Sequence, residues 1–272
     1  FEWARNPYVI LCGIYVLGPY VATVVIGDPV RGQQLISGWH KIAGVIVAVS
    51  APFLGAATDR MGRRKPLLAA VLALMAPAIF LQYWAMPGGV GLPLWALGCL
   101  VVIAAVTFAW TEVLHNSMLS AVAKPQALPH VSGLGLALGN AASVLLLVFV
   151  LWTMALPGEV DWPFLPPAPM FGLDAAAHEP SRIVAPISAL WLVLFSLPLF
   201  ISAPDLRSTG EGFGAALRNG VGNVARTLRK LGQHRNVGLF LLARMLYADG
   251  KTAILIFSGI YAAGVMGWRL IE

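Results

Sequence analysis

Charged residues are scarce in this sequence of 272 residues: Asp, Glu, Lys and Arg make up 11% of it, whereas a water-soluble domain carries roughly 25%. Hydrophobic residues make up 58%, and the mean hydropathy is +0.78. This composition excludes a soluble globular protein and predicts an integral membrane protein. The net charge is +6, but the basic residues lie in connections beside apolar runs, which is typical of membrane topology signals rather than of a nucleic-acid-binding face.

Cysteine is rare, and the motifs of soluble enzymes are missing. Cys12 and Cys99 both lie inside apolar runs, so we expect no disulfide framework. The sequence has no paired His at metal-binding spacing, no Gly-x-Ser-x-Gly elbow and no phosphate-binding loop of the Gly-x-x-x-x-Gly-Lys-Ser/Thr type. We therefore expect no enzymatic activity, no cofactor and no resident metal.

Long apolar runs fill most of the chain. A helix needs about 20 apolar residues to cross a bilayer, and Pro87-Gly88-Gly89 divides one uncharged stretch that is too long for a single helix. The predicted fold class is an all-α, polytopic transmembrane bundle with about seven spans, the seventh containing an irregular charged interval. The expected spans are residues 7–26, 37–57, 66–85, 92–114, 131–156, 183–203 and 237–267.

Lys and Arg are distributed unequally between the two sides of these spans. The N-terminal side carries Arg5, the four basic residues of 60–65, Lys124 and the six of 204–236, against Arg31, Arg182 and Arg269 on the other. Because positive loops stay in the cytoplasm, we expect the N-terminus and the loop near residue 60 to be cytoplasmic. The expected location is the plasma (inner) membrane.

Two long connections differ in character. Residues 158–182 are rich in proline and predict irregular chain over the outer mouth. Residues 204–236 are basic, and their apolar residues recur at helical spacing, which fits a helix lying on the inner membrane face or a plain solvated linker. The predicted organisation is a six-helix half at 1–203, a basic amphipathic linker at 204–236 and the start of a second half at 237–272. The apolar stripe consists of Phe213, Leu217, Val221, Val224, Leu228 and Leu231.

The stretch 55–65 has the most specific spacing in the chain: Gly, three residues, Asp-Arg, one residue, Gly-Arg-Arg-Lys. It resembles the loop between helices 2 and 3 of major facilitator superfamily transporters, and every signature position is filled. The opening Glu-Trp-Ala-Arg-Asn-Pro-Tyr is similar to the vacuolar amino-acid effluxer-like branch, as are residues 116–119, 131–139 and 247–250. This resemblance implies a fragment with one complete half and helix 7.

The resemblance also implies a gating role for this loop. Its signature residues are Gly55, Asp59, Arg60, Gly62, Arg63, Arg64 and Lys65. Asp59 is expected to cap a helix in the opposite half and to pair with a nearby Arg, while Gly55 and Gly62 allow close approach and a tight turn. The plainer alternative is that the basic residues only set topology. Because the partner helix in the second half is missing from this chain, we expect the latch between Asp59 and that helix to be open and unpaired here.

Ionisable residues inside spans are costly and often functional. Glu112, His115 and Asn116 share one face of the fourth span, and Arg244, Asp249 and Lys251 form a second group in the seventh. A buried carboxylate could bind and release a coupling proton, or a neighbouring base could hold it ionised as a structural pair. Both readings stay open.

Other polar residues give weaker indications. Asn6, Tyr15 and Asn140 could line a polar cavity, whereas Lys41, expected one turn inside the second span, is explained by interfacial anchoring. Gly135 and Gly139 give the fifth span a small-residue face for helix packing.

Family resemblance implies a secondary transporter that moves a small polar solute by alternating access, with amino-acid efflux suggested by the branch alone. The expected partners are the solute, the lipid bilayer and a coupling ion, a proton; no nucleic acid is expected. The alternative is a transport-inactive scaffold or receptor that kept the fold.

Overall fold

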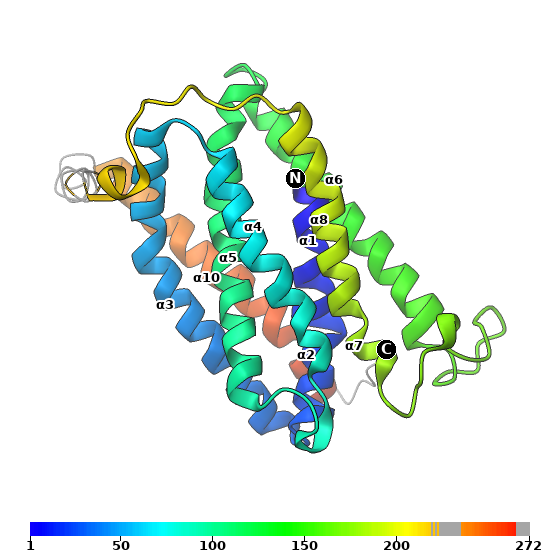
Figure 1. Cartoon of the computed structure of the whole chain (residues 1–272). Coiled ribbons are helices and arrows are strands. Elements are labelled where there is room, and N and C mark those ends of the chain that lie inside the picture. Colours follow the sequence, from blue (N-terminus) through cyan, green and yellow to red (C-terminus); the bar gives the residue numbers. More distant parts are fainter. Residues whose placement is uncertain (219, 221, 223–234, 265–272) are drawn as a thin grey trace. The chain divides into compact units, whose positions relative to one another are not determined.

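The computed structural model describes residues 1–218, 220, 222 and 235–264, and the chain divides into two compact units, Phe1–Arg218 and Asn219–Glu272 (Figure 1). Each unit is helical in its described part.

Six helices of the described residues are long and apolar enough to cross a membrane. They are Glu2–Val25, Pro29–Met61, Lys65–Trp84, Leu94–Val122, Leu128–Ala155 and Glu179–Ser202. Each overlaps one of the first six predicted spans, and the all-α polytopic prediction is confirmed. The second span begins at Pro29 rather than 37, and the fourth ends at Val122 rather than 114. Charged residues interrupt an apolar window, but they do not interrupt the backbone hydrogen bonds of a helix.

The first span is not one regular helix. It consists of α1 (Glu2–Tyr8), a π-helical stretch (Val9–Tyr15), α2 (Leu17–Tyr20) and a second π-helical stretch (Val21–Val25). Pro19 has no N–H to donate to a helical hydrogen bond. The regular helix is interrupted at Val16, whose φ is −120° and ψ −69°. A Cβ on Gly18 would lie 2.6 Å from the Gly13 carbonyl oxygen. Beyond the break, the Tyr20 hydroxyl donates to the Ala85 carbonyl at 3.0 Å.

The next helices begin and end where the sequence supplies caps. The Asp28 carboxylate accepts from two N–H groups at the start of α3 (Pro29–Met61), and Gly62, at φ 78°, ends it. A short turn leads to α4 (Lys65–Phe80). The predicted turn before α5 (Leu94–Val122) is a 3₁₀ turn at Pro87–Gly89, in which Gly88 and Gly89 both have φ 73°.

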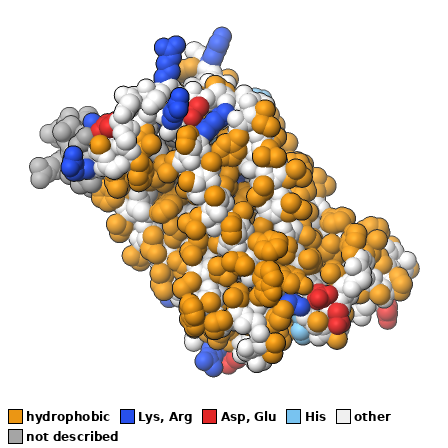
Figure 2. All heavy atoms as spheres, viewed as in Figure 1, with side chains coloured by type: hydrophobic (Ala, Val, Ile, Leu, Met, Phe, Trp, Pro, Cys, Tyr) orange, Lys and Arg blue, Asp and Glu red, His pale blue; other side chains and the backbone are white. Residues whose placement is uncertain are grey.

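Packing places the first span at the centre of the first unit. α1 packs on α6 (Leu128–Val150) and α8 (Val184–Ser202), while α5 packs on α3 and α4. In the most apolar window of the first span, 44% of the residues are buried inside the protein. The corresponding share is only 22% for α3 and 28% for the span that contains α6. Figure 2 shows hydrophobic side chains along the helix flanks, with Lys and Arg gathered at the end where α3 meets α4. The fully buried core side chains include Leu11, Leu68, Met75, Ile79, Leu97, Leu114 and Leu192.

The proline-rich connection is mostly irregular, as expected, with a short 3₁₀ turn at Met170–Gly172. It ends in α7 (Glu179–Arg182), where Arg182 is buried rather than exposed on a loop. Its guanidinium lies 4.8 Å from the centre of the Tyr83 ring and donates to the carbonyls of Tyr83 and Ala177.

The second unit contains α10 (Arg235–Gly264), which overlaps the predicted seventh span. The irregular interval expected inside that span is wrong, because the helix runs unbroken through Arg244 and Lys251. The predicted linker helix begins in the first unit, where residues 213–218 are helical. Most of the apolar stripe predicted for that linker lies outside the described residues.

Candidate functional site

The α3–α4 connection turns on Gly62. Its N–H donates to the Thr58 carbonyl at 3.2 Å, and a Cβ at this position would lie 2.0 Å from the Arg207 carbonyl oxygen. Positive φ and close approach of another backbone both require glycine here. The close approach expected at Gly55 is wrong in the described chain, because a Cβ there would meet only Val113, at 3.9 Å.

This turn brings Arg64 back beside Asp59. Arg64 Nη2 donates to Asp59 Oδ1 at 3.1 Å, which is the pairing with a nearby Arg that the resemblance implied. The contact of Asp59 with a helix of the opposite half stays a prediction. The Arg64 side chain is 8% exposed, whereas that of Asp59 is 72% exposed. Within the described residues, Nε and Nη1 of Arg64 have no hydrogen-bond partner. Arg64 is therefore a buried cation held by an acid at the surface.

A second segment, residues 204–211, lies across this connection, and we call it the strap. The Asp205 carboxylate accepts from the backbone N–H of Arg64 at 3.0 Å and of Lys65 at 3.3 Å. Lys65 Nζ donates to the Phe200 carbonyl at 2.8 Å, at the end of α8. Arg63, in contrast, is exposed.

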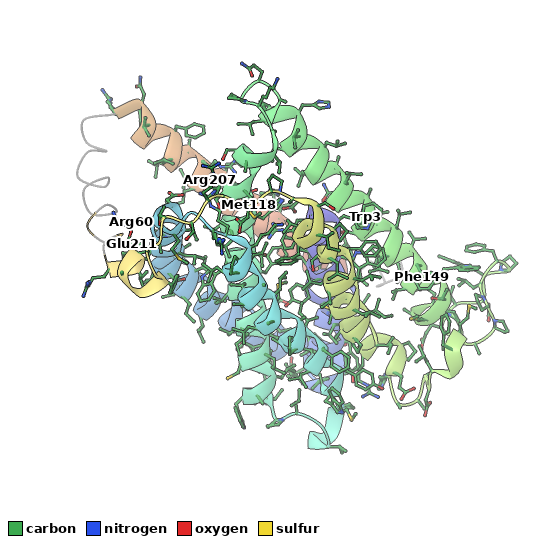
Figure 3. All side chains as sticks on the ribbon, turned by 45° about the horizontal axis from the view of Figure 1, so that its top comes forward. Trp3, Arg60, Met118, Phe149, Arg207 and Glu211 are labelled. Atoms are coloured by element: carbon green, nitrogen blue, oxygen red, sulfur yellow. The ribbon has the colours of Figure 1, made fainter. Side chains whose placement is uncertain are left out.

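The rest of the strap binds the end of α3. The Thr209 N–H donates to the Met61 carbonyl at 3.1 Å, and its hydroxyl donates to the Arg60 carbonyl. Arg60 Nε pairs with Glu211 at 3.0 Å, and the two side chains lie side by side in Figure 3. Sequence reasoning missed Asp205 and Glu211 because it treated 204–236 only as a basic linker.

The second charged cluster is centred on Arg5, which is 4% exposed. Arg5 was expected in the loop before the first span, and that position is wrong, because α1 begins at Glu2 and carries Arg5 into the helix packing. Its Nε donates to both Glu2 oxygens at 3.0 and 3.2 Å, and its Nη2 donates to Glu112 at 3.1 Å. Nη1 donates to the backbone carbonyl of Phe108. The centre of the Phe108 ring lies 4.2 Å from the guanidinium carbon of Arg5.

The predicted face of α5 is only partly brought into this cluster. The Glu112 side chain is 52% exposed and pairs with Arg5. His115 Nδ1 lies 3.5 Å from Glu2, and the ring borders a cavity of about 240 Å³ between the ends of α5 and α8. Asn116 is exposed. The geometry is that of a buried cation between two carboxylates, one of which remains accessible.

Residues 121–271, more than half of the chain, match the family described as "Vacuole effluxer Atg22 like". The chain belongs to the Atg22-like vacuole effluxer family. The predicted superfamily and branch are thereby confirmed.

A curated relative supports the same placement. The "Uncharacterized MFS-type transporter YxiO" of Bacillus subtilis (strain 168) is 22% identical over 97% of this chain. The chain spans 58% of the length of that relative. No solved structure matches the chain. The segment matched by the Atg22-like family contains two of the stretches that suggested the branch, 131–139 and 247–250, but not the α3–α4 connection.

The remaining candidates of this Atg22-like chain are more scattered. Asn6 lies at the contact of α1 with α6, where a Cβ on Gly139 would come within 2.3 Å of Asn6 Nδ2. Tyr15 and Asn140 are exposed, and their part in a cavity stays a prediction. Lys41 is exposed and lies deeper inside α3 than expected, because that helix begins at Pro29.

The second predicted group lies on α10, in the other unit. Arg244 and Lys251 are exposed, and the side chain of Asp249 lies outside the described residues. Their joint role in substrate binding or coupling stays a prediction.

Proposed function

We propose that this chain is part of a secondary transporter that moves a small polar solute by alternating access, with residues 1–203 as its first six-span half. Residues 204–236 then form the linker, and residues 237–272 start the second half. The observation that carries this proposal is the Arg5 cluster. An ionised residue in a membrane span is costly and persists where it serves a pathway, and Glu112 stays 52% exposed although Arg5 binds it.

The accessible half of this cluster suits solute and ion chemistry. Glu112 and Asn116 are one helical turn apart on α5, and both are exposed. A carboxylate with an amide beside it can bind an ammonium group or accept a proton, and His115 lies on the same helix. We therefore propose a polar, amine-bearing solute, with amino acids as the class and a proton as the coupling ion.

The family description and the charge distribution support direction and location. An effluxer exports its solute, and the proposal carries that direction to this chain. The basic residues at the α3–α4 end support a cytoplasmic placement of that end and of the N-terminus, in the plasma (inner) membrane.

Transport is tested with the full-length protein in proteoliposomes. Vesicles loaded with a radiolabelled amino-acid mixture or with labelled glucose are diluted into buffer with and without an imposed pH gradient. Gradient-dependent exit of amino acids but not of glucose is expected, and Glu112→Gln should lower the exit rate at least tenfold. Equal exit from protein-free vesicles would contradict transport and favour a scaffold or receptor. Exit that ignores the pH gradient would contradict proton coupling.

A further inference from the structure

The first turn of α4 depends on an acceptor that comes from far along the chain. A helix start leaves backbone N–H groups without partners, and the residue before α4, Arg64, makes no side-chain cap. Asp205 fills this position from the strap: one carboxylate oxygen accepts from the Arg64 N–H and the other from the Lys65 N–H. The negative charge of Asp205 also lies at the positive end of the α4 dipole.

The Asp59–Arg64 pair depends on this backbone placement. The Arg64 guanidinium makes one hydrogen bond to Asp59, at 3.1 Å, while its Nε and Nη1 have no partner among the described residues. A bond of this length is lost when its donor moves by about an ångström. The backbone that presents Arg64 is fixed on one side by the Gly62 turn and on the other by Asp205.

We propose that Asp205 is a positioning residue for the α3–α4 connection: by capping α4, it holds Arg64 where it can pair with Asp59. This inference rests on the proposed transport function, because the pair matters only if the loop takes part in a conformational cycle. Asp205 acts through Arg64, by its hydrogen bonds to the backbone N–H groups of Arg64 and Lys65. Thr209 and Glu211 hold the strap to the end of α3, so the strap closes over both sides of the turn.

A labelling experiment tests the positioning step without requiring transport. In a full-length background freed of other cysteines, Arg63→Cys places a reporter on the exposed residue beside Arg64, and a maleimide-polyethylene glycol reagent measures its reaction rate in inside-out vesicles. Asp205→Ala should raise this rate about fivefold, the factor that corresponds to loss of one helix cap. Asp205→Asn keeps one acceptor oxygen and should give an intermediate rate.

The control is Asp174→Ala, which removes an aspartate that caps its own turn in the proline-rich connection, through the Ala176 N–H. It should leave labelling unchanged. A wild-type rate in Asp205→Ala overturns the proposal. If that variant is not recovered from membranes, the Asp205→Asn rate decides: an increase supports positioning, and an unchanged rate overturns it.

Transport then separates positioning from a general structural role. Asp205→Ala, Asp59→Asn and the double variant are compared for amino-acid exit from proteoliposomes. If Asp205 acts through the pair, the double variant is no slower than Asp59→Asn alone, whereas two independent roles multiply their losses. Multiplied losses overturn the proposal. If the wild-type protein exports nothing, the proposed function fails while the labelling result still decides the role of Asp205.

Discussion

Removing Arg5 should destabilise the first unit more than any other change in its charged cluster. Arg5→Ala deletes a buried cation whose guanidinium supplies both hydrogen bonds to the Glu2 carboxylate. That carboxylate is 13% exposed, so it would remain in the interior with only His115, 3.5 Å away, beside it. Breaking a buried pair in this way costs about 3–5 kcal/mol.

A matched change on the same network should cost far less. The Glu112 carboxylate is 52% exposed, so water can replace Arg5 as its partner, and Glu112→Gln should cost about 1 kcal/mol or less. A domain of this size loses about 2–4 °C in melting temperature per kcal/mol. The expected losses are therefore roughly 6–20 °C for Arg5→Ala and roughly 4 °C or less for Glu112→Gln.

Cys12 supplies the readout, because it is 4% exposed and becomes reactive only on unfolding. Full-length variants that keep Cys12 as their single cysteine are heated in detergent with a thiol-reactive fluorophore. Arg5→Met combined with Glu2→Gln should recover part of the loss, since neither charge is then buried alone. A melting temperature for Arg5→Ala within about 2 °C of the wild type would refute the reasoning.

Three further predictions concern the helix connections and contacts. Gly62→Ala should lower stability by about 1–3 kcal/mol in the same melting assay, because alanine is strained at φ 78° and has no room there. Gly55→Ala should lie within about 0.5 kcal/mol of the wild type. Asp59→Asn should insert normally, by protease protection in vesicles, and lower transport severalfold; full transport would remove the gating role. Gly139→Ala should lower the melting temperature more than Gly135→Ala, since a Cβ would clash at the first position and meet only an atom 3.9 Å away at the second.

The spans could be predicted because membrane insertion is decided locally. About 20 apolar residues in a row are sufficient evidence for a helix, and each of the six observed spans overlaps its prediction. The ends could not be predicted in this way, because Arg5 and Arg31 lie within helices although their charge ended the apolar runs. Hydropathy indicates where lipid is tolerated, while backbone hydrogen bonding decides where the helix begins.

The site could be predicted only where its signal is local. Glu112 is conspicuous as a charge in an apolar run, and the spacing of residues 55–65 identified the α3–α4 connection. The partner of Glu112 could not be found in the same way, because Arg5 lies 107 positions away. Asp205 and Glu211 are likewise 141 and 151 positions from their partners. A proline followed by an aspartate directly after a span was the one available signal for the strap.

The distance between the strap and the connection that it covers sets an order of assembly during synthesis. The ribosome synthesises the α3–α4 connection long before Asp205. The first turn of α4 therefore lacks its cap while the three spans that follow α4 are inserted into the membrane. That connection can reach its final form only after α8 has entered the membrane. A chain truncated after residue 202 would therefore carry the six spans of the first unit and still lack the cap on α4, which site-specific labelling can detect.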